Sequence, residues 1–419
     1  MFYGAHAFAN EDHKEITGPF NNPMEVTQKC LECHEDASHD VMQTSHWTWT
    51  LEQTCSDEKG VVQRGKHNVM NNFCISIAGN WPRCTSCHVG YGWKDNSFDH
   101  NDTSRVDCLV CHDTTGAYKK PGAGAGMPAG YTGVQKFDKK PVDLVKVAQN
   151  AGAPGRDNCV VCHGFGGGGN NVKHGDIDSS MVKPTRDHDV HMGADGLNFS
   201  CQECHSTESH QIKGNAMAVS PKGKNHLNCT ECHDAEPHQE SLINNHAARV
   251  ACQTCHIPEI AKEMPTKMSW DWSTAGDTVV DPPLDDYGMP TYNKKKGTFV
   301  WKKNLVPAYA WYNGTAGGSH LGDKIDPTIV TRLSFPKGDI NDKTAKIYPF
   351  KVHTGKQIYD AKLNHLLTPK VYGEKNDPDA YWVNFDWNKA ATAGAKASGI
   401  EYSGEYGFAP TEMYWRINH

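Results

Sequence analysis

The sequence has few aliphatic side chains for its length. Leu, Ile, Val and Phe together make up about 16% of the 419 residues, below the roughly 20% under which a chain seldom buries enough apolar surface to order itself. The net charge of −7 is nevertheless modest, and 11 Trp, 15 Tyr and 13 Phe argue against disorder. A conventional aliphatic interior is therefore excluded, and something other than aliphatic side chains must fill the core.

Long hydrophobic runs and basic clusters are also missing. No apolar run in the sequence approaches the roughly 18 residues that indicate a membrane-spanning helix, so we expect a chain that does not span a membrane. Lys and Arg number 42 against 49 Asp and Glu. No Lys/Arg-rich face stands out that would neutralise phosphates, which argues against nucleic acid as a partner.

Cysteine, in contrast, is abundant and regularly placed. Fourteen of the 16 cysteines belong to a C-x-x-C-H motif that occurs seven times. In chain order, motifs 1 to 7 are Cys30/Cys33/His34, Cys84/Cys87/His88, Cys108/Cys111/His112, Cys159/Cys162/His163, Cys201/Cys204/His205, Cys229/Cys232/His233 and Cys252/Cys255/His256. This motif attaches c-type haem: the two thiols bond to the porphyrin and the adjacent imidazole binds the iron. Zinc ribbons and thioredoxin-like sites also use C-x-x-C, but neither requires the following histidine.

Seven covalently bound haem c groups would supply the missing apolar interior. We therefore predict a multihaem cytochrome c fold, mainly α-helical with much irregular coil organised around the haems and a few β-strands in the C-terminal part. Residues 10–256 are the expected haem-binding domain, and residues 257–419, which lack cysteine, are an aromatic-rich region expected to wrap exposed haem edges. Residues 1–9 form an N-terminal extension or the remnant of a secretory signal, because they end in a small-x-small triplet.

Histidine is more abundant than seven proximal ligands require, since the chain has 24. We expect most irons to carry a second histidine, a coordination that favours electron transfer over substrate chemistry. A distal ligand close to its own motif is expected to reach the neighbouring haem. The distal candidates are His39, His46, His174, His191, His210, His226, His238, His246, His353 and His419.

Cys55 and Cys74 stand outside the seven motifs. An extracytoplasmic compartment, indicated by c-type haem and the many cysteines, favours a disulfide between them. The alternative is a sulfur atom placed near a reactive haem.

Local patterns predict a few regular elements. Residues 142–149 and 386–397 have helical character, and residues 298–302 and 305–311 are predicted to form a pair of strands. The glycine-rich stretch 164–171 follows a haem motif rather than a strand, so we interpret it as backbone packed against a porphyrin and not as a phosphate-binding loop.

Longer strings of sequence resemble the octahaem tetrathionate reductase family of periplasmic cytochromes over nearly the whole chain. The matching strings are Thr17-Gly-Pro-Phe, Ser45-His-Trp-Thr-Trp, Asn71-Asn-Phe-Cys-Ile, Arg83-Cys-Thr-Ser-Cys-His-Val-Gly-Tyr-Gly-Trp, Cys111-His-Asp-Thr-Thr-Gly, Gly166-Gly-Gly-Gly, Val172-Lys-His-Gly-Asp, Asp189-Val-His-Met and Glu412-Met-Tyr-Trp. The resemblance implies a multihaem reductase that acts on tetrathionate, nitrite or hydroxylamine, with a lysine as distal ligand of the active-site haem.

The resemblance does not by itself choose the lysine. Lys146 is the first candidate, with Lys119 and Lys120 as alternatives, and the iron would be that of motif 4 or motif 3. The family also has an eighth motif beyond the segment that here ends in Tyr414-Trp-Arg-Ile-Asn-His419, whereas seven motifs are present. Either the last haem is lost, or the sequence is incomplete; if it is lost, His419 can ligate a haem of another subunit.

Two functions follow from these patterns. The first is a periplasmic or extracellular oxidoreductase that takes electrons from redox partners, such as other cytochromes or quinol-linked donors, and reduces a small oxyanion. The second is a conduit in which every iron is bound by two histidines and the chains self-associate into an oligomer or a conductive filament.

Overall fold

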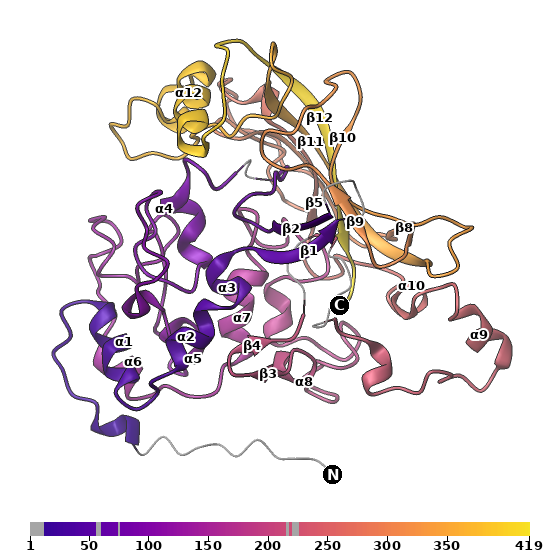
Figure 1. The fold of residues 1–419 in the computed structure, drawn as a ribbon, viewed down its shortest axis with the longest axis horizontal. Coiled ribbons are helices and arrows are strands. Elements are labelled where there is room, and N and C mark those ends of the chain that lie inside the picture. The colour runs from indigo at the N-terminus through magenta and orange to yellow at the C-terminus, as the bar shows by residue number, and fades with distance from the viewer. Residues whose placement is uncertain (1–11, 56–59, 74–75, 215–217, 220–225) are drawn as a thin grey trace. The chain divides into compact units, whose positions relative to one another are not determined.

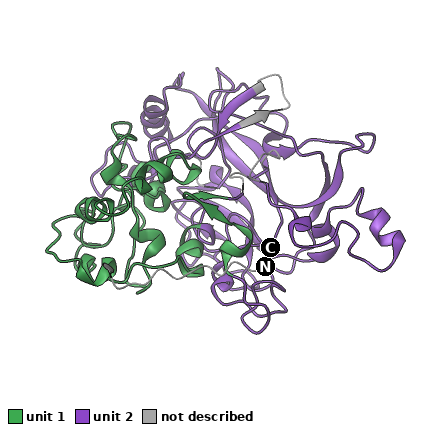
Figure 2. Ribbon diagram, turned by 60° about the horizontal axis from the view of Figure 1, so that its bottom comes forward, with its two compact units in different colours: residues 1–48, 81–162, 200–212 green, residues 49–80, 163–199, 213–419 purple. Residues whose placement is uncertain are grey.

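The computed structural model describes residues 12–55, 60–73, 76–214, 218–219 and 226–419. The expected signal remnant at residues 1–9 and the predicted Cys55–Cys74 disulfide lie outside these described residues, the latter because of Cys74. The chain divides into two compact units, drawn in different colours in Figure 2. Unit 1 contains residues 1–48, 81–162 and 200–212, and unit 2 contains residues 49–80, 163–199 and 213–419. The sequence predicted a different division, into residues 1–9, 10–256 and 257–419, according to which part binds haem. That division stays a prediction.

Unit 1 consists of short helical segments joined by irregular loops. Its α-helices are α1 (Pro23–Leu31), α2 (Ala37–Met42), α3 (Ser45–Thr48), α4 (Trp81–Cys84), α5 (Leu109–His112), α6 (Leu144–Ala148), α7 (Arg156–His163, whose last residue belongs to unit 2) and α8 (Cys201–Cys204). Its 3₁₀ segments are η1 (Asp12–Glu15), η2 (Thr85–Cys87) and η3 (Thr103–Arg105), and its one described hairpin is β3 (Thr207–Glu208) with β4 (Gln211–Ile212).

Local capping explains where several of these helices begin. The Asn22 side chain accepts a hydrogen bond from the backbone of Glu25 and Pro23 opens α1, both of which favour a helix N-terminus. Asp143 likewise accepts from the backbone N–H of Lys146 at the start of α6. The helix predicted at residues 142–149 is therefore confirmed, over Leu144–Ala148.

Unit 2 combines haem motifs 6 and 7 with a large mixed sheet (Figure 1). Its sheet strands are β5 (Thr266–Asp271), β6 (Tyr292–Asn293), β7 (Gly297–Lys302), β8 (Ala308–Tyr312), β9 (Ala316–Gly318), β10 (Thr331–Pro336), β11 (Lys346–Asp360) and β12 (Tyr406–Arg416). The remaining elements are the hairpin β1 (Leu51–Cys55) with β2 (Gly60–Arg64), η4 (Ser179–Val182), η5 (Cys229–Glu231), α9 (Ser241–His246), α10 (Cys252–His256), η6 (Trp272–Thr274), α11 (Tyr381–Asn384) and α12 (Trp387–Ser398).

Seven of the eight strands follow the order β6-β7-β5-β11-β12-β10-β9. The eighth strand, β8, pairs with the N-terminal end of β11. The 15-residue β11 is the spine, antiparallel to β12 and β8 and parallel to β5. Both strands predicted near residue 300 exist, but they do not pair with each other: β7 pairs with β5 and β6. The helix predicted at residues 386–397 is confirmed as α12, which Asp386 caps and Gly399 ends in a left-handed conformation.

The sheet has its own core, built largely from aromatic residues. Alternate residues of β7 and β12 are buried, the period expected when one face of a strand is covered. Trp270 and Trp272 stack with centroids 4.8 Å apart, and both are fully buried. The core also contains Phe299, Trp301, Leu333, Ile358, Tyr381, Trp387, Met413 and Trp415. These buried aromatics pack against one another, and the expectation that residues 257–419 wrap haem edges stays a prediction.

The secondary structure corrects the predicted fold class in one respect. Helix and strand are nearly balanced, at 23% and 20%, whereas a mainly α chain with a few strands was expected. The C-terminal part contains an eight-stranded sheet where a few strands were expected. Among the helices that the structure describes, none is long and apolar enough to cross a bilayer.

Candidate haem-binding sites

The seven motifs lie on or beside short helical turns. Cys30 of motif 1 is in α1, motif 2 spans the end of α4 and η2, and motifs 3 to 7 coincide with α5, α7, α8, η5 and α10. In a helical turn, positions i and i+3 lie on the same face. The spacing of each motif therefore presents both thiols to one side, as two bonds to a single porphyrin require.

Thiols from different motifs meet inside unit 1. Hydrogen bonds join Cys30 to Cys108, Cys159 to Cys201 and Cys162 to Cys87. Motifs 1 and 3, 4 and 5, and 2 and 4 are therefore neighbours in pairs. Such proximity is what a chain of closely spaced haems needs, because electrons move between haems only over short distances.

Burial makes several of these thiols poor acids. Desolvation, followed by the nearby charge of Asp107, raises the pKa of the Cys111 thiol to about 11. The contact with Cys30, followed by desolvation, raises the pKa of Cys108 well above its usual value. Both cysteines of motif 3 thus face an environment that disfavours charge and suits an apolar macrocycle.

Other motif thiols are exposed to solvent in the structure. Motifs 6 and 7 lie on η5 and α10, and neither of these short turns has a buried residue. A porphyrin bonded at an exposed pair would have to cover the thiols itself, because the protein does not. Haem attachment at these cysteines therefore rests on the C-x-x-C-H motif and stays a prediction. The exposed cysteines are Cys33 of motif 1, Cys204 of motif 5, Cys229 and Cys232 of motif 6, and Cys252 and Cys255 of motif 7.

Four pairs of histidines have the separation expected for two ligands of one iron. A metal–imidazole bond is about 2.0 Å long, so rings bound on opposite sides of an iron have centroids roughly 6.3 Å apart. The observed pairs are His13 with proximal His34 at 6.2 Å, His210 with His112 at 6.5 Å, His191 with His233 at 6.0 Å, and His238 with His256 at 5.8 Å. These residues therefore fit haem irons bound by two imidazoles.

Second contacts orient some of these rings. His112 Nδ1 donates to the carbonyl of Gly152 at 2.8 Å, and His13 Nδ1 donates to the carbonyl of Ala151 at 3.2 Å. Metal-binding histidines characteristically donate their other ring N–H in this way, which fixes the tautomer and leaves Nε2 for the metal. Both rings are thus prepared to bind iron through Nε2.

Two further histidines lie close to proximal ones. Burial, followed by the nearby His205, lowers the pKa of His46. Burial, followed by Lys173 and proximal His163, lowers the pKa of His174 well below its usual range. Both imidazoles are therefore neutral at physiological pH, the form that binds metal. Six of the seven proximal histidines thus have a second histidine nearby.

Motif 2 has different surroundings. Proximal His88 is fully buried, and its ring lies 5.0 Å from Trp47, 4.8 Å from Trp93 and 5.6 Å from Phe98. Its Nε2 hydrogen bonds to the carbonyl oxygen of Trp47 at 2.7 Å. This bond must be exchanged before Nε2 can bind an iron, so motif 2 fits haem less directly than the paired sites do.

The three lysine candidates differ sharply in environment. Lys146 is exposed on α6, whose buried residues Leu144 and Val147 pack in an apolar cluster with Leu109 of motif 3. Lys119 is exposed in a loop. Lys120 instead has a side chain only 5% exposed, and its amine forms an ion pair with Asp107 at 2.9 Å.

The other distal candidates are scattered. His39 and His246 are exposed, and His226 is half-buried. The backbone N–H of His419 donates to Asp176 at 3.2 Å. His353 is fully buried in β11, where its Nδ1 faces Asn72 Oδ1 at 3.0 Å, and its Nε2 has no hydrogen-bond partner among the described residues.

Sequence reasoning missed His13. This residue lies in η1, well before motif 1, whereas the candidates were chosen mainly for short spacings to a motif. No local signal marks it, because its approach to His34 depends on the path of the intervening chain.

Comparisons with known proteins identify the chain as similar to cytochromes c. Residues 184–257 match the family model described as cytochrome c7 and related cytochrome c, and residues 267–419 match the model described as bacterial cytochrome c. An uncharacterized protein of Archaeoglobus fulgidus is 25% identical over 236 residues, which are 46% of this chain and 77% of that protein.

A solved structure extends the likeness to nearly the whole molecule. The crystal structure of octahaem cytochrome c from Shewanella oneidensis is 58% identical and superposes with a TM-score of 0.89, covering 97% of this chain and 90% of that one. Together with the motifs, this likeness confirms the resemblance. The chain belongs to the octahaem tetrathionate reductase family of multihaem c-type cytochromes.

Proposed function

We propose that this protein is an extracytoplasmic reductase of sulfur or nitrogen oxyanions, in which seven haems pass electrons to one iron that has a lysine as its distal ligand. The observation that carries the proposal is the exposed Lys146 on α6, a helix that packs against the segments of motifs 1 and 3. The likeness to an octahaem cytochrome along 97% of the chain supports the same conclusion.

The chain's own residues suit this role. When bound, the haems supply one-electron redox chemistry, and their potentials depend on the ligands and on the surrounding charges. Asp143 caps α6 and fixes the backbone from which Lys146 projects. An amine at an exposed position can leave a metal to admit a substrate, and once protonated it can donate hydrogen bonds to a bound oxyanion.

Lys146 suits this role better than the alternatives. The amine of Lys120 is already held by Asp107 and by the carbonyl oxygen of His88. Lys119 is exposed, but it lies in a loop rather than on a helix. The iron nominated from sequence is that of motif 3 or motif 4. Because His210 lies beside His112 and His174 near His163, Lys146 would have to take the place of one of these two histidines, and the spectra of ligand variants distinguish the two irons.

The test is replacement of Lys146 by Ala in the haem-loaded protein, with Lys140→Ala as a matched control because Lys140 is exposed in the preceding loop. We expect Lys146→Ala to alter the spin state of one ferric haem and to lower the rate of tetrathionate, nitrite or hydroxylamine reduction at least tenfold. A parent-like spectrum and rate would reject Lys146, and absence of turnover in the parent protein would reject the reductase.

A second function, a non-catalytic conduit, is favoured by the histidines beside six of the seven proximal ligands. If every iron has two strong ligands, cyanide and nitrite should leave the spectrum of the reduced protein unchanged. Filaments in negative-stain images would support a polymerised conduit. Discrete particles with turnover would exclude it.

A further inference from the structure

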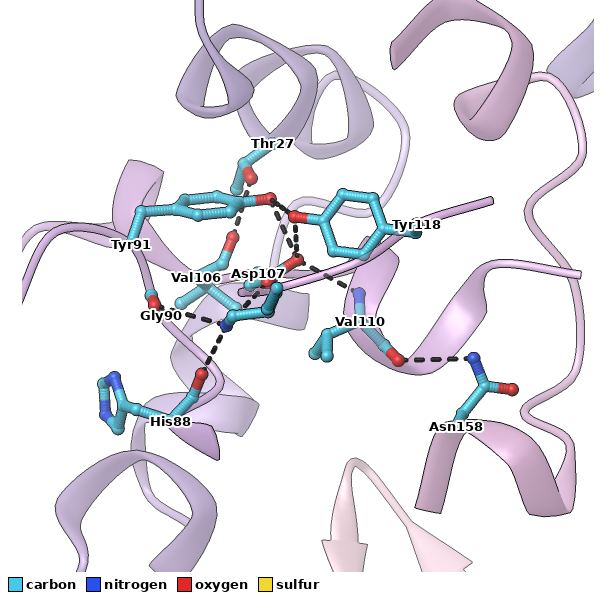
Figure 3. Close-up of polar contacts among 10 residues, drawn as sticks. Thr27, His88, Gly90, Tyr91, Val106, Asp107, Val110, Tyr118 and Asn158 are labelled. Carbon is cyan, nitrogen blue, oxygen red and sulfur yellow. Dashed lines mark hydrogen bonds and ion pairs between the residues drawn. The ribbon is translucent and has the colours of Figure 1, made fainter. Parts of the chain in front are cut away.

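A buried ion pair lies among the haem motifs of unit 1, and its acidic member, Asp107, is labelled in Figure 3. Lys120 Nζ is 2.9 Å from Asp107 Oδ2, and the two side chains are 5% and 0% exposed. Removing two charges from water is costly, and replacing such a pair by apolar residues is often neutral or stabilising. Stability alone therefore does not explain this pair, and its other contacts indicate what it does.

Lys120, the basic member of the pair, hydrogen bonds to the backbone of motif 2. Lys120 Nζ donates to the carbonyl oxygen of His88 at 2.6 Å and lies 3.5 Å from that of Gly90. These carbonyls belong to the proximal histidine itself and to the second residue after it. The amine thus restrains the chain from which the His88 imidazole projects.

Asp107, the acidic member of the pair, accepts a hydrogen bond from the backbone of motif 3. Asp107 directly precedes Cys108, and its Oδ1 accepts a hydrogen bond from the backbone N–H of Val110 at 3.0 Å. The same oxygen accepts from the hydroxyls of Tyr91 and Tyr118, each at 3.0 Å. Oδ1 thus accepts three hydrogen bonds, whereas the buried Oδ2 has no hydrogen-bond partner among the described residues and is compensated by the ion pair with Lys120.

Motifs 1 and 4 reach the same stretch of chain. Thr27 in α1 donates through its hydroxyl to the carbonyl of Val106 at 2.7 Å. Asn158 in α7 donates to the carbonyl of Val110 at 3.2 Å. Figure 3 shows these contacts converging on the segment around Asp107, so four haem-attachment segments are joined at one point.

We propose that Lys120 is a positioning residue for electron transfer between the haems of motifs 2 and 3. By binding the His88 carbonyl and the Asp107 carboxylate together, it fixes the orientation of the proximal imidazole and the spacing of the two attachment segments. The inference rests on haem attachment within the proposed function, but it does not depend on substrate reduction, so a chain without reductase activity still tests it.

The test uses the haem-loaded full chain. Lys120→Gln combined with Asp107→Asn removes both charges, so no unpaired charge is buried. Lys94→Gln is the matched control, since Lys94 is exposed six residues after His88. Haem content per chain is measured first by pyridine haemochrome absorbance, followed by electron paramagnetic resonance of the ferric protein and a spectroelectrochemical redox titration.

We expect the double variant to keep the parent's haem content, while one low-spin ferric signal changes its g-values and the midpoint potential of at least one haem shifts. The control should match the parent in both. Parent-like g-values and potentials in the double variant would overturn the proposal.

If the double variant does not take up its full haem content, Tyr118→Phe decides. This change removes one donor to Asp107 Oδ1 and alters no charge. A smaller change in a low-spin signal supports the proposal, whereas the parent spectrum overturns it.

Discussion

The haem-motif segments of unit 1 and the C-terminal sheet of unit 2 are built on different principles. In unit 1 the helices are nine residues or shorter, and one apolar cluster has seven buried members, Val26, Leu109, Tyr118, Val142, Leu144, Val147 and Ala148. The sheet has a larger core that includes five tryptophans. The difference indicates that the sheet folds around its own side chains, and we expect unit 1 to need haem as part of its interior.

Removal of haem gives the largest effect that this comparison predicts. In the haem-free chain we expect unit 1 to lose protection against hydrogen exchange, because its short helices are marginal without packing. The strands β5, β7, β11 and β12 should keep theirs. Hydrogen–deuterium exchange with mass spectrometry measures both regions in one experiment. Equal protection in both, with or without haem, would break the comparison.

A substitution in the sheet core tests whether the sheet can be destabilised without affecting haem binding. Trp272 is fully buried against Trp270, so Trp272→Ala should lower the free energy of unfolding of the sheet by about 3 to 5 kcal/mol without changing haem content. Tyr309→Ala is the control, since Tyr309 is 47% exposed. Denaturant unfolding followed by tryptophan fluorescence measures the loss. A loss of haem in the Trp272 variant would show that the two regions are not independent.

A ligand substitution in unit 1 should act locally. His210 lies 6.5 Å from proximal His112, so His210→Ala should convert one haem from low spin to high spin while the covalent haem content stays constant. The neighbouring Gln211→Ala is the matched control. Absorption and electron paramagnetic resonance spectra report the spin state, and an unchanged spectrum would remove His210 from the ligands.

The smallest effect concerns the acid stability of unit 2. Hydrogen bonds from Thr344 and then Asn313 lower the pKa of Asp342 from 3.8 to about 2. Because the folded pKa is the lower one, the carboxylate stabilises the fold above pH 3.8, and this contribution is lost as the pH falls toward 2.

Asp342→Asn should therefore show a smaller fall in thermal midpoint between pH 5 and pH 2.5 than the parent. Asp286→Asn, at an exposed carboxylate, serves as the control. An identical fall in the Asp342 variant and the parent would contradict the assignment.

The cytochrome family was readable from sequence, because the C-x-x-C-H motif is local and each of its residues has a fixed chemical task. The same holds for α6 and α12, where Asp143 and Asp386 mark helix starts. The sheet order was not readable: β7 and β8 are close in sequence, yet β7 pairs with β5 and β8 with β11, because strand pairing depends on contacts distant in sequence.

The burial of the motif cysteines and the pairing of the histidines could not be predicted from the sequence either. The motif does not tell a half-buried thiol such as Cys111 from an exposed one such as Cys255, because burial depends on the rest of the fold. His13 and the pairing of His238 with His256 depend on loop paths that no periodicity encodes.

The two neighbouring lysines show the same limit. Lys120 and Lys119 are adjacent and identical in type, yet one is buried against Asp107 and the other is exposed. Only the three-dimensional arrangement separates them.

The central claim is that porphyrins are covalently attached at the seven motifs. Intact-mass spectrometry of the purified protein, together with its pyridine haemochrome spectrum, tests this most directly. The account predicts a red protein with the mass of the polypeptide plus seven haems. A colourless protein with the mass of the bare polypeptide would contradict it.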